Sequence, residues 1–190
     1  MKKTLNILVT VILIGTVSFS FISKTAVAFK PGNPDGHEQI ADNLFIADAF
    51  FVKYNLTLGP RTSPHIRDWS TIDRTSKIGV VDDVRWEFDN AEKAAEYHAK
   101  NLKVNSESGL EIQAKIYIPG ALNLHIYRES KSITDLNKEM GIDTKEFYFL
   151  FTIDKVVAKV FVSVNGDVSV NDASVFAIEA AKTIKKALGK

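Results

Sequence analysis

Apolar residues recur at intervals of three and four over residues 37–58. The recurring positions are Ile40, Leu44, Ala47, Phe51, Tyr54 and Leu58. In a helix these positions share one face. Asp35 and Glu38 have the spacing of a capping box, and Gly59-Pro60 is a pair that stops helices. The pattern therefore predicts one deeply packed helix over residues 37–58.

Residues 60–79 have no such periodicity and are polar and irregular. Within them, Ser63-Pro64 is typical of the first residues of a short helix. Ile66, Trp69 and Ile72 would then lie on the inner side of that helix. We predict a long connection here, interrupted by one short helix.

A strand and two further helices are predicted from alternation and capping signals. Apolar and charged residues alternate over 84–88, as in a half-buried strand. A second capping box, Asp89-x-x-Glu92, predicts a helix that continues to about residue 102. Residues 132–140 predict a short helix or turn. Asn171 or Asp172 would cap a final helix, whose buried face is Ala173, Phe176, Ala177, Ala180, Ile184, Ala187 and Leu188.

Two hairpins are predicted from the parity of their apolar positions. The apolar residues of 110–118 and 122–126 are all even-numbered, so a three-residue loop, 119–121, would place Ile116 opposite Leu124. The apolar residues of 147–153 are odd and those of 156–162 are even. A two-residue loop, Asp154-Lys155, would therefore place Phe151 opposite Ala158. Because this second hairpin is apolar on both faces, we expect it at the centre of the sheet.

The predicted elements make a single α+β domain over residues 37–190. It would contain an antiparallel sheet of about five strands, with helices packed on both of its faces.

The first 28 residues have the pattern of a secretory signal peptide. Lys2 and Lys3 precede an apolar run from Leu5 to Ile22, and Ala26-Val27-Ala28 is a signal-peptidase pattern. Residues 29–36 are a linker rich in Pro and Gly. The alternative is an uncleaved membrane anchor, since the run is long for a signal peptide. No later stretch could span a bilayer. We expect a secreted or periplasmic protein with a leader of bacterial type.

Composition and charge narrow the possible partners. The chain is 45% hydrophobic and 25% charged, which is ordinary for a globular protein. Its net charge is +1, but three of its 24 basic residues lie in the leader, which has no acid. The remaining 21 basic and 23 acidic residues give a net charge of −2, so we expect no nucleic-acid partner. The absence of cysteine excludes disulfides, thiolate metal sites and cysteine-linked lipids.

No known catalytic motif is present, and the four histidines are far apart in the sequence. We therefore expect no metal and no cofactor, and favour a binding or accessory domain over an enzyme. Its partner would be another protein, a surface polymer or a small ligand.

The connection 60–79 is the main candidate site, because long loops in compact domains are often functional. Its candidate binding residues are Arg61, His65, Arg67, Asp68 and Trp69. The alternative is that Trp69 pins the segment to the core, and the exposure of its side chain separates the two interpretations. A second candidate is a polar sheet face with Lys115, His125 and Tyr127.

Two other functions stay open on the sequence. One is a hydrolase or metal-assisted enzyme whose site is assembled in space from His65, Asp68 or His125. The other is a carrier of a small apolar ligand, held in a cavity between helix 37–58 and the sheet.

Overall fold

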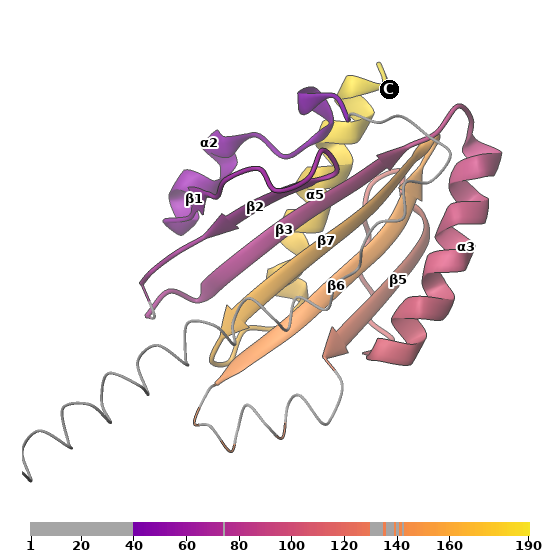
Figure 1. Cartoon of the computed structure of the whole chain (residues 1–190). Helices are drawn as coiled ribbons and strands as arrows, with labels where there is room; N and C mark the ends of the chain where they lie inside the picture. The colour runs from indigo at the N-terminus through magenta and orange to yellow at the C-terminus, as the bar shows by residue number, and fades with distance from the viewer. Residues whose placement is uncertain (1–39, 74, 130–134, 136–138, 140, 142) are drawn as a thin grey trace, which may run out of the picture. The chain divides into compact units, whose positions relative to one another are not determined.

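The computed structural model describes residues 40–73, 75–129, 135, 139, 141 and 143–190 (Figure 1). The predicted leader over 1–28, the linker over 29–36 and most of 132–140 lie outside the described residues. No helix among the residues described is long and apolar enough to cross a membrane.

One antiparallel sheet of seven strands organises the domain, in the spatial order β1-β2-β3-β7-β6-β5-β4. The strands are β1 (Thr57–Leu58), β2 (Ile66–Ser70), β3 (Ile78–Glu87), β4 (Gly109–Glu111), β5 (Leu122–Glu129), β6 (Thr144–Ile153) and β7 (Val156–Asn165). The α+β class and the single domain agree with the sequence, but the predicted count of five strands is too low. The two additional strands are β1 and β2.

Strand β2 replaces the short helix that was predicted after Ser63-Pro64. Its five residues pair with β3, with Trp69 opposite Val81 and Ile66 opposite Val84. Ile66 and Trp69 therefore lie on different faces of the sheet, because side chains alternate along a strand. The helical interpretation is wrong, since backbone pairing with β3 decided the conformation of this polar stretch.

The β6–β7 hairpin has the predicted register and position. Phe151 lies opposite Ala158, and Ile153 opposite Val156, so Asp154-Lys155 is the two-residue loop. Asp154 has a φ of 52°, the left-handed conformation that tight hairpin loops require. The hairpin lies between β3 and β5, in the middle of the sheet (Figure 1).

The first predicted hairpin is wrong in its extent and register. Only β4 pairs with β5, Glu111 lying opposite Tyr127, and residues 112–118 are not a strand. The Ile112 N–H donates to the Ile126 carbonyl at 2.9 Å. This register differs from the predicted one by two residues, and a slip of two leaves every side chain on the same face. The apolar pattern therefore could not distinguish the two registers.

The helix predicted over 37–58 is also wrong. It is divided into η1 (Asp42–Leu44), α2 (Asp48–Phe51) and η2 (Val52–Tyr54). Two buried charged residues of β3 bind the backbone at the last residue of η1 and just after it. Asp83 accepts a hydrogen bond from the Ile46 N–H at 2.9 Å, and the Arg85 Nε donates to the Leu44 carbonyl at 3.4 Å. These contacts replace helical hydrogen bonds, so tertiary structure overrides the local periodicity.

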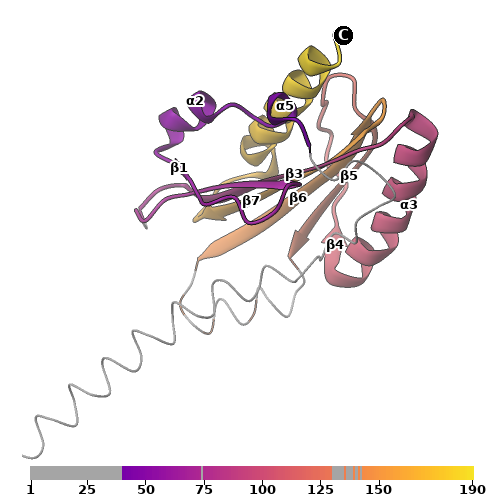
Figure 2. The same ribbon diagram turned by 45° about the horizontal axis from the view of Figure 1, so that its top comes forward.

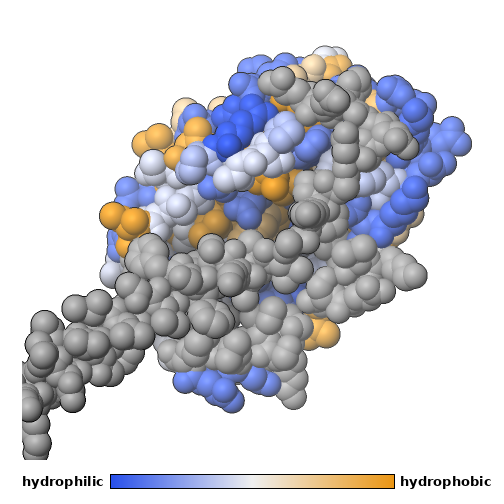
Figure 3. Space-filling view, in the orientation of Figure 1, coloured by the Kyte–Doolittle hydropathy of each residue, from blue (hydrophilic) through white to orange (hydrophobic). Residues whose placement is uncertain are grey.

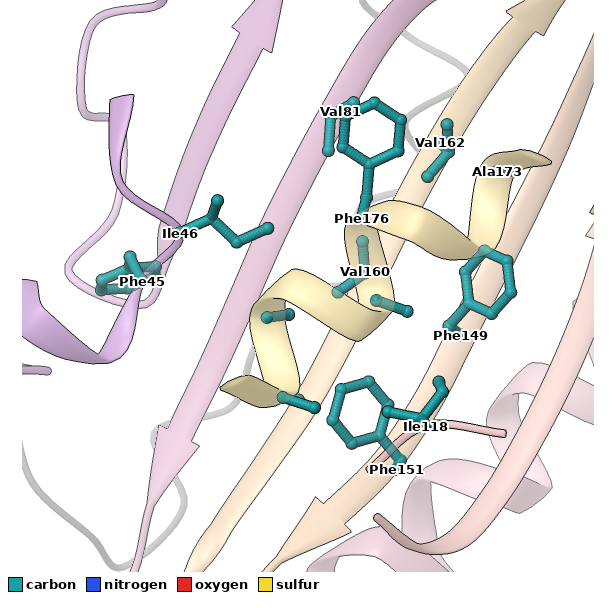
Figure 4. Packing of buried hydrophobic residues seen from close by; sticks show 14 of the residues in the cluster. Phe45, Ile46, Val81, Ile118, Phe149, Phe151, Val160, Val162, Ala173 and Phe176 are labelled. Atoms are coloured by element: carbon teal, nitrogen blue, oxygen red, sulfur yellow. The ribbon is translucent and has the colours of Figure 1, made fainter. Parts of the chain in front are cut away.

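Two long helices pack against the sheet. In α5 (Val170–Ala187), Ser169 is the N-cap, in a capping box with Asp172, so the cap lies two or three residues before the predicted one. Phe176, Ala177 and Ala180 are buried against β6 and β7 as predicted, beside Phe149 and Val160 (Figure 4). The other helix, α3 (Ala91–Ser108), packs against β5, β6 and β7 (Figure 2), and its Tyr97 contacts Trp86 of β3 and Phe88.

Candidate functional site

Ionisable side chains gather on the sheet face opposite the α5 core. Asp68 of β2 lies opposite Asp82 of β3, Asp82 opposite Phe161 of β7, and Phe161 opposite Tyr148 of β6. Directly opposed residues of antiparallel strands share a face. These four side chains therefore form one row across four strands.

Lys159 and Glu146 flank this row on the same face, because each lies two residues from a member of it. We call Asp68, Asp82, Glu146, Tyr148 and Lys159 the charged face. Figure 1 views the sheet from this side, with α5 behind it. In the same orientation, Figure 3 shows hydrophilic and hydrophobic residues intermixed.

Short contacts join the members of the charged face on β6 and β7. The Tyr148 hydroxyl donates to the Glu146 carboxylate at 2.8 Å, and the Glu146 N–H donates to Glu129 at 2.7 Å. The Lys159 Nζ lies 5.1 Å from the centroid of the Tyr148 ring, and the Phe161 ring is 5.0 Å from the same ring. Tyr148 thus contacts Glu146, Lys159 and Phe161.

Burial shifts the pKa of every member of the charged face. It raises the pKa of Asp82 to about 7, with a further contribution from the negative charge of Asp68. It lowers the pKa of Lys159 to about 8, against the attraction of Asp82. Burial also raises the pKa of Asp68, Glu146 and Tyr148 above their ordinary values.

Partly buried carboxyl groups of this kind lower the free energy of unfolding. Their charged forms lose hydration, and Asp68 and Asp82 also repel each other. Clusters of groups with shifted pKa values occur preferentially at functional sites. Such a cluster can take up or release a proton near neutral pH, and an arriving positive charge would relieve its repulsion.

The predicted site residues of β2 are divided between the two faces of the sheet. Asp68 belongs to the charged face, whereas its neighbours Arg67 and Trp69 point to the α5 side. Trp69 is only 1% exposed; its ring stacks on Phe51 with centroids 3.9 Å apart, and its Nε1 donates to Asp48 at 3.3 Å. This burial favours the interpretation that Trp69 pins the segment to the core.

Arg61 and Arg67 meet at one carboxylate on the surface. Both guanidinium groups form ion pairs with Asp42 of η1, at 3.0 Å and 2.8 Å respectively. His65 is buried, and its Nδ1 lies 3.1 Å from the Arg85 carbonyl oxygen. Of the five predicted residues, the structure therefore brings together only the two arginines.

The second predicted site lies partly beneath α3. His125 contacts Glu111 at 2.8 Å, and its ring centroid is 5.5 Å from that of the buried His98 of α3. Tyr127 is only 3% exposed, while Lys115 is exposed in the segment that is not a strand. Asp68 and His125 are four strand spacings apart, about 19 Å at about 4.8 Å each. They cannot belong to one catalytic site.

Asp82 and Lys159 were missed by the sequence reasoning, although a signal was present. Lys159 is the one charged residue of the apolar segment 156–162, and Asp82 stands with Asp83 among the valines of 80–84. A charged side chain at such a position loses hydration, and this cost points to a functional role. Only the strand order β2-β3-β7-β6, however, shows that Asp68, Asp82 and Tyr148 lie in one row.

Other features of the described residues give weaker indications of a functional site than the charged face does. Where the alternative of a carrier needs a cavity, between residues 37–58 and the sheet, Phe51, Trp69 and Phe176 pack ring against ring. An open hollow of about 520 Å³ lies at the β1 edge of the sheet, lined in part by Leu58, Ser70 and Ile72. Within the described ranges, no group of three or more His, Asp or Glu residues could hold a metal ion.

Comparisons with known proteins add little to this geometry. No protein-family model matches the chain, and no curated protein matches it. Among solved structures, the extracellular domain of PknH from Mycobacterium tuberculosis is similar, with a TM-score of 0.41 and 12% sequence identity. The match covers 78% of this chain and 74% of that one. A similarity of this degree assigns neither a family nor a function.

Proposed function

We propose that this chain is an exported binding domain that recognises a cationic group, such as an alkylammonium, at the charged face. One observation carries the proposal. Asp68 and Asp82 are adjacent carboxyl groups whose pKa values are both raised, that of Asp82 to about 7. An incoming cation would favour their charged forms and offset the cost of their burial.

The remainder of the charged face also suits an organic cation. Three carboxyl groups, on Asp68, Asp82 and Glu146, stand against the single ammonium group of Lys159. Lys159 already lies over the ring of Tyr148, which shows that this ring accepts an ammonium group. A ligand ammonium beside Phe161 would find a carboxyl group and an aromatic ring within a short distance of each other.

Export is the part of the proposal that rests on the sequence alone. The support is the basic start, the apolar run and the Ala26-Val27-Ala28 pattern of the leader. Protein recovered from the exported fraction should begin at Phe29 by intact mass. A retained leader would contradict export in soluble form and would leave the charged face to be tested separately.

The exported protein should bind putrescine, a small diammonium ion, in a calorimetric titration at fixed ionic strength. If the ligand requires ionised Asp82, binding should be about tenfold tighter at pH 8 than at pH 6, because the ionised fraction changes by about that factor around a pKa of about 7. Neutral 1,4-butanediol, a probe of similar length, should not bind.

Variants separate this site from general attraction by negative charge. Asp82→Asn should weaken putrescine binding and abolish its pH dependence. Asp167→Asn removes an equal charge from a fully exposed side chain and is the matched control. An equal loss in both variants, or no binding of putrescine to the unmodified protein, would refute the proposed function.

A further inference from the structure

A second charged cluster lies on the α5 side of the sheet, independent of the charged face. Arg67 of β2 lies opposite Asp83 of β3, and the fully buried Arg85 forms an ion pair with Asp83. Arg61 and Arg67 share Asp42. Among the residues that the structure describes, this cluster has three guanidinium groups and two carboxylates, an excess of one positive charge.

Backbone carbonyl groups and the ring of Phe45 fix the positions of the Arg61 and Arg67 guanidinium groups. The Arg61 Nη2 donates to the Pro64 carbonyl at 2.8 Å, and its Nε donates to the Ser63 carbonyl at 3.3 Å. Both guanidinium groups lie over the buried ring of Phe45, 5.7 Å away for Arg61 and 5.5 Å for Arg67. A pair of guanidinium groups fixed in this way is preorganised to bind an anion.

Asp42 contacts both guanidinium groups and lies on their solvent side. Its side chain is 69% exposed, whereas those of Arg61 and Arg67 are 33% and 18% exposed. Both ion pairs use the same oxygen atom, Oδ1. The Nε of Arg67 is buried and has no hydrogen-bond partner within the described part of the chain. Asp42 therefore leaves one donor of Arg67 unsatisfied, and its exposed side chain has room to turn into solvent.

We propose that Arg61 and Arg67 form a binding site for a dianionic tetrahedral oxyanion, a phosphate or a phosphate monoester, and that Asp42 is its internal competitor. A dianion that displaces Asp42 would bring the net charge of the cluster from one positive charge to zero. Several oxygen atoms on one centre could accept hydrogen bonds from both guanidinium groups, whereas Asp42 contacts both through the single atom Oδ1.

The test uses inorganic phosphate at pH 8, where it is mostly a dianion, followed by calorimetry in chloride at constant ionic strength. Asp42→Asn should bind phosphate about tenfold or more tightly than the unmodified protein, because it removes a charge-assisted competitor. Arg67→Gln should abolish binding. Arg128→Gln, which removes an exposed arginine of β5, is the matched control and should leave binding unchanged.

Two results would overturn the proposal. One is an Asp42→Asn variant that binds phosphate no better than the unmodified protein. The other is acetate binding to that variant as tightly as phosphate, which would indicate a site for single carboxylates. Should Arg67→Gln fail to fold, Arg61→Gln supplies the same loss of binding from a more exposed residue.

Discussion

At the scale of single residues, consecutive side chains of one strand lie in different surroundings. Asp68 and Trp69 are consecutive in β2, yet Asp68 lies beside Asp82 on the charged face and Trp69 is buried against Phe51. The alternation of a strand explains this division, because consecutive residues of a strand point to opposite faces of the sheet. Replacements at these positions should therefore have different consequences.

Trp69→Ala should lower the free energy of unfolding by about 3–5 kcal/mol, as the truncation of a large buried side chain does. The physical reason is the loss of its stacking on Phe51 and of the burial of the whole ring. Urea denaturation of the two proteins measures the difference.

Ile72→Ala is the control for this truncation, because Ile72 is fully exposed a few residues away and should change stability little. A loss below about 1 kcal/mol for Trp69→Ala would show that the ring does not anchor the segment, since core truncations of this size cost several times more.

The sequence contained the chemistry of the charged face but not its arrangement. Asp82 and Lys159 could be noticed as charges inside apolar segments. Their neighbours across the sheet depend on β2 pairing with β3, 14 residues apart for Asp68 and Asp82, and on β3 pairing with β7, 79 residues apart for Asp82 and Phe161. A local pattern carries no information about pairing over that distance.

At the scale of elements, α3 is held to the sheet partly by a buried histidine. His98 is only 2% exposed, and its Nε2 has no partner within the described residues. Burial lowers its pKa, and so does the charge of the nearby His125, which contacts Glu111. In the folded protein His98 is therefore harder to protonate than in the unfolded chain.

This shift predicts that acid weakens the fold. As the pH falls below about 6.5, the ordinary pKa of histidine, the unfolded state binds a proton that folded His98 does not, and the free energy of unfolding falls by up to about 1.4 kcal/mol per pH unit. In His98→Gln the decrease between pH 7 and pH 5 should be smaller, as urea denaturation at the two pH values would show. Equal decreases in the two proteins would contradict this role.

Elements were predictable from the sequence where the apolar patterns of two adjacent strands and the loop between them agreed on one pairing. The β6–β7 hairpin has the predicted register because the parity of its apolar residues and the two-residue loop Asp154-Lys155 agree on it. Segment 110–118 allowed a slip of two residues, and the helix expected over 37–58 is interrupted because Asp83 and Arg85 bind its backbone. Contacts with a distant strand decided those two segments, so their own periodicity was not sufficient.

At the scale of the whole described domain, one sheet separates two charge clusters, one with more negative groups and one with more positive groups. Carboxyl groups exceed cations on the charged face, and guanidinium groups exceed carboxylates around Arg67 and Asp83. The hydrophobic core of α5, β6 and β7 carries the stability, which allows the two clusters to keep buried charges that cost stability. The proposed cation and oxyanion sites can therefore be tested independently of each other.

The most direct test of the account is the titration of the Asp82 carboxyl carbon by NMR in the protein labelled with ¹³C-aspartate. We expect a midpoint of about 7, and a lower midpoint in the presence of putrescine, because the cation favours the ionised form. A midpoint near 4, the ordinary value for aspartate, or one that putrescine leaves unchanged, would contradict the claim that the charged face is a buried site for a cation.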